Sequence, residues 1–267
     1  MDLGSIIGVV GGFFFLIISI FITANWNVPT VIAFVSPASA LIVFGGIFAS
    51  TVFAVKFDKF LEAMKSVGIV FRPPVLDPAA SIDKIVALAN TARKEGVLAL
   101  EESTEVMDDP FLKKGIMLVV DGTDPELVKG IMETELAYID ERHLDTAATF
   151  EYMGSQGPAW GMIGTIIGLI LMLMELSDPS SLGPKMSVAF VTTFYGSVLA
   201  NLIFIPIANK MKLVSSEEIL LKTVLIEGML SIQAGENPRI IEEKLKSFLA
   251  PVLRDKVGMA KAREVDE

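Results

Sequence analysis

The residues of this sequence that could carry chemistry are few, and those that stand out lie inside apolar segments. Thr165 and Thr193 each place a hydroxyl in a long apolar run. Such a hydroxyl either bonds back to a carbonyl of its own helix or offers an oxygen to a passing ion. Pro158 and Pro206 also lie in apolar runs. A proline either starts a helix, where its missing N–H costs little, or lies inside one and distorts it.

The usual catalytic residues are scarce. The sequence has no cysteine, which excludes disulfides, thiolate metal sites and a cysteine nucleophile. Its one histidine, His143, lies in a charged helical pattern and is expected at the surface. We find no nucleophile motif and no phosphate-binding loop, and a net charge of −10 argues against general nucleic-acid binding. We therefore expect neither an enzyme nor a metal site.

Four segments must position these residues, because each is long and apolar enough to cross a membrane as a helix. They are Leu3–Thr23, Val31–Val55, Ser155–Met174 and Met186–Ala208. Pro37 and the pair Gly45-Gly46 are expected to interrupt the second segment. The first segment is preceded by Asp2 and by no lysine or arginine, unlike a cleaved signal peptide, so we expect it to be retained.

None of the four segments contains Asp, Glu, Lys, Arg or His. Ion-driven membrane machines usually keep an ionisable group at membrane depth, because its change of charge couples flux to motion. If this chain serves such a machine, the carboxylate must therefore come from a partner.

The basic residues predict the topology. Of the 22 lysines and arginines, eleven lie in residues 56–153 and ten in residues 210–267. By the positive-inside rule, both segments and both termini are expected in the cytoplasm. This divides the chain into spans one and two (1–55), a cytoplasmic helical domain (56–153), spans three and four (154–209) and cytoplasmic C-terminal helices (210–267).

The segments 56–153 and 210–267 are predicted to be helical. Asp77, Asp109, Asp124 and Asn237 each precede a proline, which places a side-chain acceptor at the N-cap and proline at the first helical position. A further helix is expected to start at 215–218 and to run to about Gln233. The predicted fold is all-α: a four-helix integral membrane protein with a helical cytoplasmic domain.

Three motifs carry a resemblance that covers nearly the whole chain. They are Gly-Pro-Ala-Trp-Gly-Met-Ile-Gly-Thr at 157–165, Thr-Thr-Phe-Tyr-Gly at 192–196 and Ile-Glu-Gly-Met-Leu-Ser-Ile-Gln-Ala-Gly-Glu-Asn-Pro-Arg at 226–239. Together with the order of spans, they resemble the A subunit of the bacterial flagellar motor stator, the MotA/PomA family.

The resemblance implies a ring-forming homo-oligomer in the bacterial cytoplasmic membrane. Five A subunits would surround the single transmembrane helices of two B subunits, which bring an essential aspartate and a peptidoglycan-binding domain. Protons or sodium ions passing between A and B subunits would drive torque on the switch ring of the flagellar rotor. No cofactor is implied besides the coupling ion, H+ or Na+.

The resemblance also assigns residues. Pro158 and Pro206 match the family prolines of spans three and four, and Thr165 and Thr193 match hydroxyl positions associated with ion passage in sodium-driven members. The coupling ion stays open, since threonine at position 165 does not exclude protons. The glycines near Pro158 are expected to let the partner helix come close.

A charged run, Thr91–Glu102, matches the rotor-facing charges of the family. Arg93 and Glu101 occupy the matching places, with Lys94 and Glu102 as neighbours. Complementary charge suits a contact that forms and releases repeatedly. The competing interpretation is a solvated helix face, which is the usual fate of such a run.

Two other classes of function stay open. One is an energy-transducing ring subunit of the ExbB/TolQ type, which typically has three spans. The other is a membrane scaffold or solute transporter without a motor role. A fourth span would disfavour the first, and transport by the chain alone in liposomes would favour the second.

Overall fold

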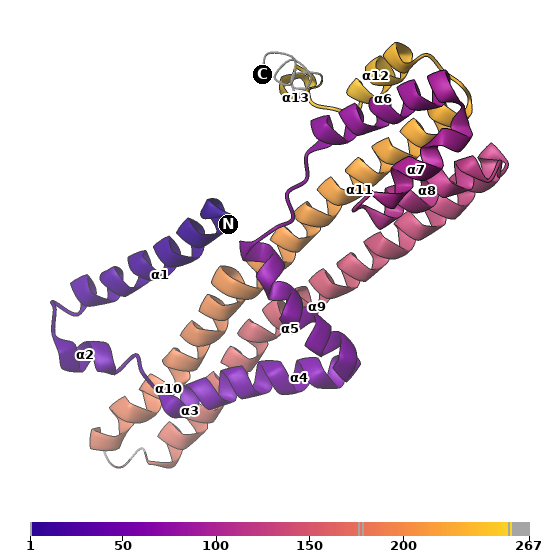
Figure 1. Cartoon of the computed structure of the whole chain (residues 1–267). Coiled ribbons are helices and arrows are strands. Elements are labelled where there is room, and N and C mark those ends of the chain that lie inside the picture. The colour runs from indigo at the N-terminus through magenta and orange to yellow at the C-terminus, as the bar shows by residue number, and fades with distance from the viewer. Residues whose placement is uncertain (1, 176, 178, 256, 258–267) are drawn as a thin grey trace. The chain divides into compact units, whose positions relative to one another are not determined.

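The structure is a computed structural model, and it describes residues 2–175, 177, 179–255 and 257. These residues form helices and connecting loops, with no strand among them (Figure 1), so the predicted all-α fold is confirmed. The chain divides into two compact units. Unit 1 comprises Met1–Pro74 and His143–Val214, and unit 2 comprises Val75–Arg142 and Ser215–Glu267.

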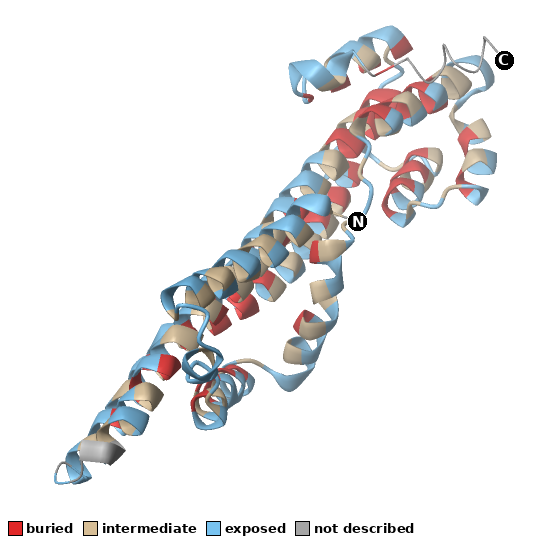
Figure 2. Ribbon diagram, turned by 90° about the vertical axis from the view of Figure 1, so that its left-hand side faces the viewer, coloured by how far each residue is buried: buried red, intermediate tan, exposed pale blue. Residues whose placement is uncertain are grey.

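Unit 1 holds the four helical segments that are long and apolar enough to cross a membrane. The first is α1 (Leu3–Thr23), whose bounds are those predicted from the sequence. Its 21 residues rise about 31 Å, which matches the hydrocarbon core of a bilayer. No residue of α1 is buried, and Figure 2 shows the helix next to the N-terminus in the exposed and intermediate colours.

The second predicted span is broken. It consists of α2 (Val28–Ile32), α3 (Pro37–Ala40), the π-helix η1 (Leu41–Gly45) and α4 (Gly46–Ala54). The prediction that Pro37 interrupts this span is confirmed, because no helix covers residues 33–36 and a new helix starts at Pro37. The Ser36 hydroxyl accepts a bond from the Ser39 N–H at 3.2 Å, and the proline occupies the first turn, where its missing N–H needs no partner.

The third span belongs to α9 (Pro125–Met174), a single helix of 50 residues where the sequence had predicted a helix and a separate span. Pro158 lies inside α9, which excludes the alternative that it occupies a first helical turn. An interior proline removes the N–H that would bond to the carbonyl of Gly154, at a cost of roughly 3 kcal/mol. The surrounding packing must therefore offset this cost.

The fourth span runs through α10 (Pro179–Val198), the π-helix η3 (Leu199–Phe204) and the start of α11 (Ile205–Gln233). Pro206 cannot donate to the Leu202 carbonyl, and the π-helix lies immediately before it. Because α11 continues to Gln233, Pro206 does not end a helix at the membrane surface. The helix predicted to start at 215–218 is also part of α11.

Between the spans of unit 1 lies α5 (Phe57–Phe71). Unit 1 thus includes residues 56–74, and the predicted cytoplasmic block 56–153 is divided between the two units. The main buried apolar cluster of unit 1 comes from η1, α4, α5, α9, η3 and α11. It includes Val43, Ile47, Phe150, Met153 and Phe204.

Unit 2 contains α6 (Pro78–Glu95), the 3-10 helix η2 (Val97–Ala99), α7 (Leu100–Glu105), α8 (Pro110–Val120), α12 (Pro238–Lys246) and α13 (Pro251–Arg254), with parts of α9 and α11. Three predicted N-caps are confirmed, because the side chains of Asp77, Asp109 and Asn237 accept bonds from N–H groups of the first turn. Asp124 does the same for the Glu126 N–H at 3.0 Å. The motif at 226–239 thus ends α11 and starts α12 on the core of this unit.

Candidate ion-pathway site

The third and fourth spans approach each other along a line of small residues, which we call the α9–α10 seam. On α9 it comprises Gly157, Gly161, Gly164 and Gly168, and on α10 it comprises Ala189, Thr192, Thr193 and Gly196. A Cβ atom on Gly157 would lie 2.5 Å from the Gly196 carbonyl oxygen, and one on Gly168 would lie 2.7 Å from the Ala189 nitrogen. No side chain larger than hydrogen fits at either glycine without moving backbone.

The seam corrects the prediction for these glycines. They do let a helix come close, but the helix is α10 of the same chain and not that of a partner. A partner helix can therefore meet only the remaining faces of α9.

The seam brings the two predicted threonines together. The hydroxyl oxygens of Thr165 and Thr193 lie 2.5 Å apart, so one donates to the other. Thr165 Oγ1 also lies 2.9 Å from the Ala189 carbonyl oxygen and 3.1 Å from that of Gly161, on its own helix. Thr193 Oγ1 lies 3.4 Å from each of the same two carbonyl oxygens.

These contacts form an oxygen cluster: two hydroxyl oxygens and the carbonyl oxygens of Gly161 and Ala189. The Thr192 hydroxyl also lies 2.9 Å from the Ala189 carbonyl oxygen. A threonine hydroxyl has one proton but two lone pairs, so the Thr165 and Thr193 oxygens keep lone pairs that can accept a bond. Thr165 is half-buried and Thr193 is exposed, so the cluster lies at the rim of the seam. Chemically, it can accept hydrogen bonds or take part in coordinating a cation, as carbonyl and hydroxyl oxygens do in ion-conducting proteins.

The two prolines lie at different places. Pro158 precedes Thr165 by seven residues, which puts it on the same side of α9 about 10 Å along the axis. It is exposed. Pro206 is exposed too, but it lines a groove together with residues of α1 and α5. The structure therefore groups Pro158 with the threonines and separates Pro206 from them.

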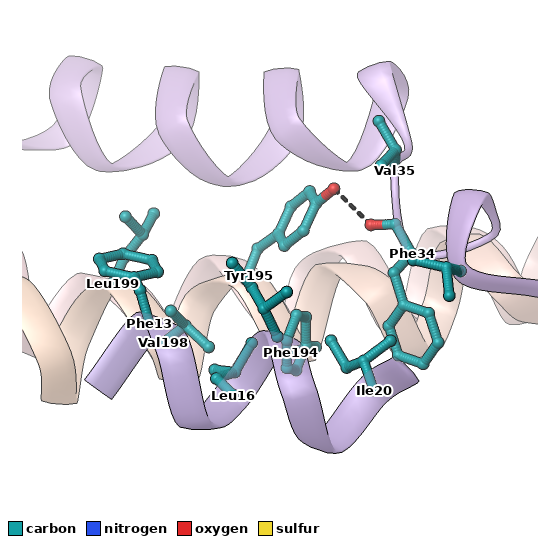
Figure 3. Close-up of a pocket in the computed structure, with 11 residues that line it drawn as sticks. Phe13, Leu16, Ile20, Phe34, Val35, Phe194, Tyr195, Val198 and Leu199 are labelled. Atoms are coloured by element: carbon teal, nitrogen blue, oxygen red, sulfur yellow. Dashed lines mark hydrogen bonds between the residues drawn. The ribbon is translucent and has the colours of Figure 1, made fainter. Parts of the chain in front are cut away.

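Sequence reasoning missed three polar residues of the fourth span. Ser197 and Asn201 are exposed and follow Thr193 at intervals of four residues, a spacing that could have been noticed. The Asn201 side chain donates to the Ser197 carbonyl at 2.9 Å. Tyr195 points toward the break in the second span (Figure 3), where its hydroxyl donates to the Phe34 carbonyl at 2.6 Å. Only the fold reveals that contact, because the two residues are far apart in sequence.

The predicted rotor-facing charges lie in unit 2 and do not share one helix face. Arg93 and Lys94 are in the last turn of α6, and Glu101 and Glu102 are in the first turn of α7. Gly96, with φ of 91°, reverses the chain between the two pairs. All four side chains are exposed, and no ion pair joins any of them to another described residue. Basic residues at a helix end and acidic ones at a helix start also suit the helix dipoles.

Comparison with known proteins gives the class first. Residues 103–223 match the MotA/TolQ/ExbB proton channel family, a family of ion-channel subunits. The chain is 41% identical to motility protein A of Borreliella burgdorferi, covering 97% of this chain and 98% of the relative. It is 39% identical to the chemotaxis protein PomA of Vibrio alginolyticus, covering 93% and 96%.

Solved structures point to the same family as these relatives. The C. jejuni MotAB structure matches with a TM-score of 0.87 at 27% identity, covering 94% of this chain and 97% of that one. The flagellar MotAB stator complex of Bacillus subtilis matches with a TM-score of 0.84 at 32% identity, covering 96% and 99%. The chain belongs to the family of flagellar motor stator A subunits represented by motility protein A and PomA. The names of these relatives favour the stator subunit over the ExbB/TolQ alternative.

Proposed function

We propose that this bacterial inner-membrane protein conducts protons or sodium ions along the exposed rim of its α9–α10 seam, between itself and a B subunit. The observation that carries the proposal is the oxygen cluster of Thr165 and Thr193, which lies in spans that contain no Asp, Glu, Lys, Arg or His. A path without its own titrating group needs one from a partner. The names of the related MotAB complexes support a B-subunit partner and an oligomer.

The assembly we infer is a ring of five copies around two single-helix B subunits, each of which brings an aspartate to the membrane. Both termini of the chain are cytoplasmic in this arrangement. The proposal needs no cofactor besides the coupling ion.

The mechanism we infer has the cation neutralise the partner's aspartate, which changes how the partner helix fits against the face around Pro158 and Thr165. The ring then steps. A monovalent ion that crosses a potential of 100 mV gains roughly 2.3 kcal/mol, which biases such a step about fiftyfold. Thr193 supplies the second hydroxyl of this face, and Pro206 acts further along the same span.

The main test is Pro158→Leu, which restores a backbone N–H to α9 and adds bulk on the exposed face. We expect the complex to assemble with its B subunit, as checked by co-purification, while swimming stops. Pro184→Leu is the matched control, because Pro184 is also an exposed proline inside a helix but lies in the first turns of α10, away from the oxygen cluster. Normal swimming by the Pro158 variant would refute the assignment of Pro158 to the ion pathway.

The coupling ion is tested separately. Swimming speed is measured at fixed pH over a series of sodium concentrations, and again at fixed sodium over a series of pH values. A sodium-driven stator follows the first series and a proton-driven stator follows the second. The oxygen cluster supplies ligands for a dehydrated cation and so favours the sodium result.

We propose that Arg93, Lys94, Glu101 and Glu102 meet the rotor's switch ring through complementary charge. Arg93→Glu is expected to reduce swimming severalfold without affecting assembly, because like charges then oppose each other in the contact. Lys129→Glu makes the same charge change at another exposed position of unit 2 and should swim normally. Equal effects of the two substitutions would mean that net charge, and not this surface, matters.

A further inference from the structure

A groove of about 620 Å³ lies in unit 1, between the first turns of α1, the end of α5 and the region where η3 meets α11. We call it the α1 groove. Its apolar lining includes Gly8, Val9, Val70, Phe71, Leu202 and Ile207. Its volume is within the range of pockets that hold small-molecule ligands.

The groove exists because α1 has glycines, which carry no side chain, where it passes the other helices of unit 1. A Cβ atom on Gly8 would meet nothing within 4 Å, whereas one on Gly12 would collide with the Leu202 side chain. The helix therefore contacts Leu202 at Gly12 and leaves open space beside Gly8. No residue of α1 is buried within the chain.

One end of the groove carries a pair of opposite charges. Asp2 Oδ2 lies 2.8 Å from Lys210 Nζ and accepts a bond from the Ser5 hydroxyl at 2.5 Å. The Asp2 N–H donates to the Phe71 carbonyl at 3.0 Å. The bond from Lys210 is the main reason that the pKa of Asp2 falls from its ordinary 3.8 to about 2, so the Asp2 carboxylate is charged at neutral pH. Asp2 precedes the first span and Lys210 follows the fourth, which puts this end at a membrane surface.

A second apolar groove makes a useful contrast. It has a volume of about 310 Å³ and lies beside the other half of α1, against Phe34 and Phe194 (Figure 3). Its polar group, the Tyr195 hydroxyl, already donates to the Phe34 carbonyl. No charged side chain lines it. This second groove therefore has no feature that would select a headgroup, whereas the α1 groove does.

We propose that the α1 groove binds a phospholipid with a zwitterionic amine-and-phosphate headgroup, of the phosphatidylethanolamine kind. One acyl chain lies along the apolar lining beside Gly8. The phosphate pairs with Lys210, and the headgroup amine pairs with Asp2. A plain acidic lipid would pair with Lys210 but would bring its charge next to the Asp2 carboxylate, so it binds less well. Pro206 also lines the groove, so the lipid contacts the fourth span at the proline that follows its π-helix.

The test uses the full chain in complex with its B subunit, reconstituted in nanodiscs of equal parts phosphatidylethanolamine and phosphatidylglycerol. The complex is then extracted in mild detergent, and the retained lipid is identified by native mass spectrometry. We expect phosphatidylethanolamine to be retained by the native complex. Gly8→Leu should fill the groove and lose it.

Gly11→Leu is the matched control, because it makes the same change on the same helix, at a glycine that does not line the groove and whose Cβ would also meet nothing within 4 Å. It should keep the lipid. Retention of the lipid by the Gly8 variant would overturn the proposal. Loss of the ring in the Gly8 variant alone would also overturn it, because the groove would then hold a second copy of the chain.

The headgroup assignment is tested by Asp2→Asn. An asparagine side-chain oxygen can still accept the bond from the Ser5 hydroxyl, so the helix start should survive the change. Lys210 then has no carboxylate beside it. The ratio of phosphatidylglycerol to phosphatidylethanolamine retained by the complex should rise about tenfold, the usual effect of one charge-assisted bond. An unchanged preference would refute the assigned pairing of amine with Asp2. None of these outcomes depends on whether the chain conducts ions.

Discussion

The first span and the pair formed by the third and fourth spans are built in opposite ways. The α9–α10 seam has glycines that face backbone on the neighbouring helix, whereas the glycines at positions 8 and 11 of α1 face open space. Within a membrane, apolar side chains gain little from leaving lipid, so close packing itself holds helices together. The seam therefore fixes the positions of its polar groups, while α1 leaves grooves along its side. The difference shows which helices set the ion-pathway geometry and which can accommodate lipid.

The sharpest test of this comparison places one methyl group in each region. Gly157→Ala puts a Cβ 2.5 Å from the Gly196 carbonyl oxygen, so backbone must move. We expect a loss of about 2–3 kcal/mol in stability and loss of swimming. Gly11→Ala meets nothing within 4 Å and should be neutral or slightly stabilising. Thermal unfolding of the purified complexes measures both, and equal shifts would contradict the distinction.

The next test removes hydroxyls from each region. Thr165→Val and Thr193→Val should each lower ion-driven swimming speed by up to about tenfold at limiting ion concentration, because each breaks the shared bond. The double variant should be scarcely worse than either single one, since both act on the same cluster. Ser19→Ala, which removes an exposed hydroxyl from α1, should swim normally. Additive effects of the two threonines would show that they act separately.

A smaller effect is expected where α1 meets the body of unit 1. Leu202→Ala removes the side chain that fits over Gly12 and should cost about 1 kcal/mol in packing. The expected result is faster proteolysis at the start of α1, with swimming retained. If α1 stays as protected as in the native protein, the contact at Gly12 does not hold the helix.

The smallest effect concerns pH. Asp2 has a folded-state pKa near 2, below its ordinary 3.8, so its pairing with Lys210 stabilises the protein above pH 3.8. That stabilisation fades as the pH falls from 3.8 toward 2. The difference in melting temperature between the native protein and Asp2→Asn should thus be constant above about pH 5 and shrink below pH 4. A difference that grows on acidification would contradict this sign.

Much of the fold could be predicted from sequence because it depends on local patterns. The length of the first apolar run predicted the bounds of α1. A polar residue before a proline predicted the N-caps of α6, α8 and α12. Prolines were harder to interpret, because a proline can either start a helix or lie inside one. Pro37 starts a helix because Ser36 caps it, whereas Pro158 lies inside one. The difference depends on what surrounds each proline.

By itself, the sequence determined that this is a helical membrane protein whose spans carry no titrating group, because composition and periodicity are local properties of the chain. It also supplied the residues that relate the chain to stator A subunits. Only the tertiary structure decided which residues meet: Thr165 with Thr193, Tyr195 with the broken second span, and Asp2 with Lys210. These pairs are 28, 161 and 208 residues apart in sequence, and only the packing of helices against one another brings them into contact.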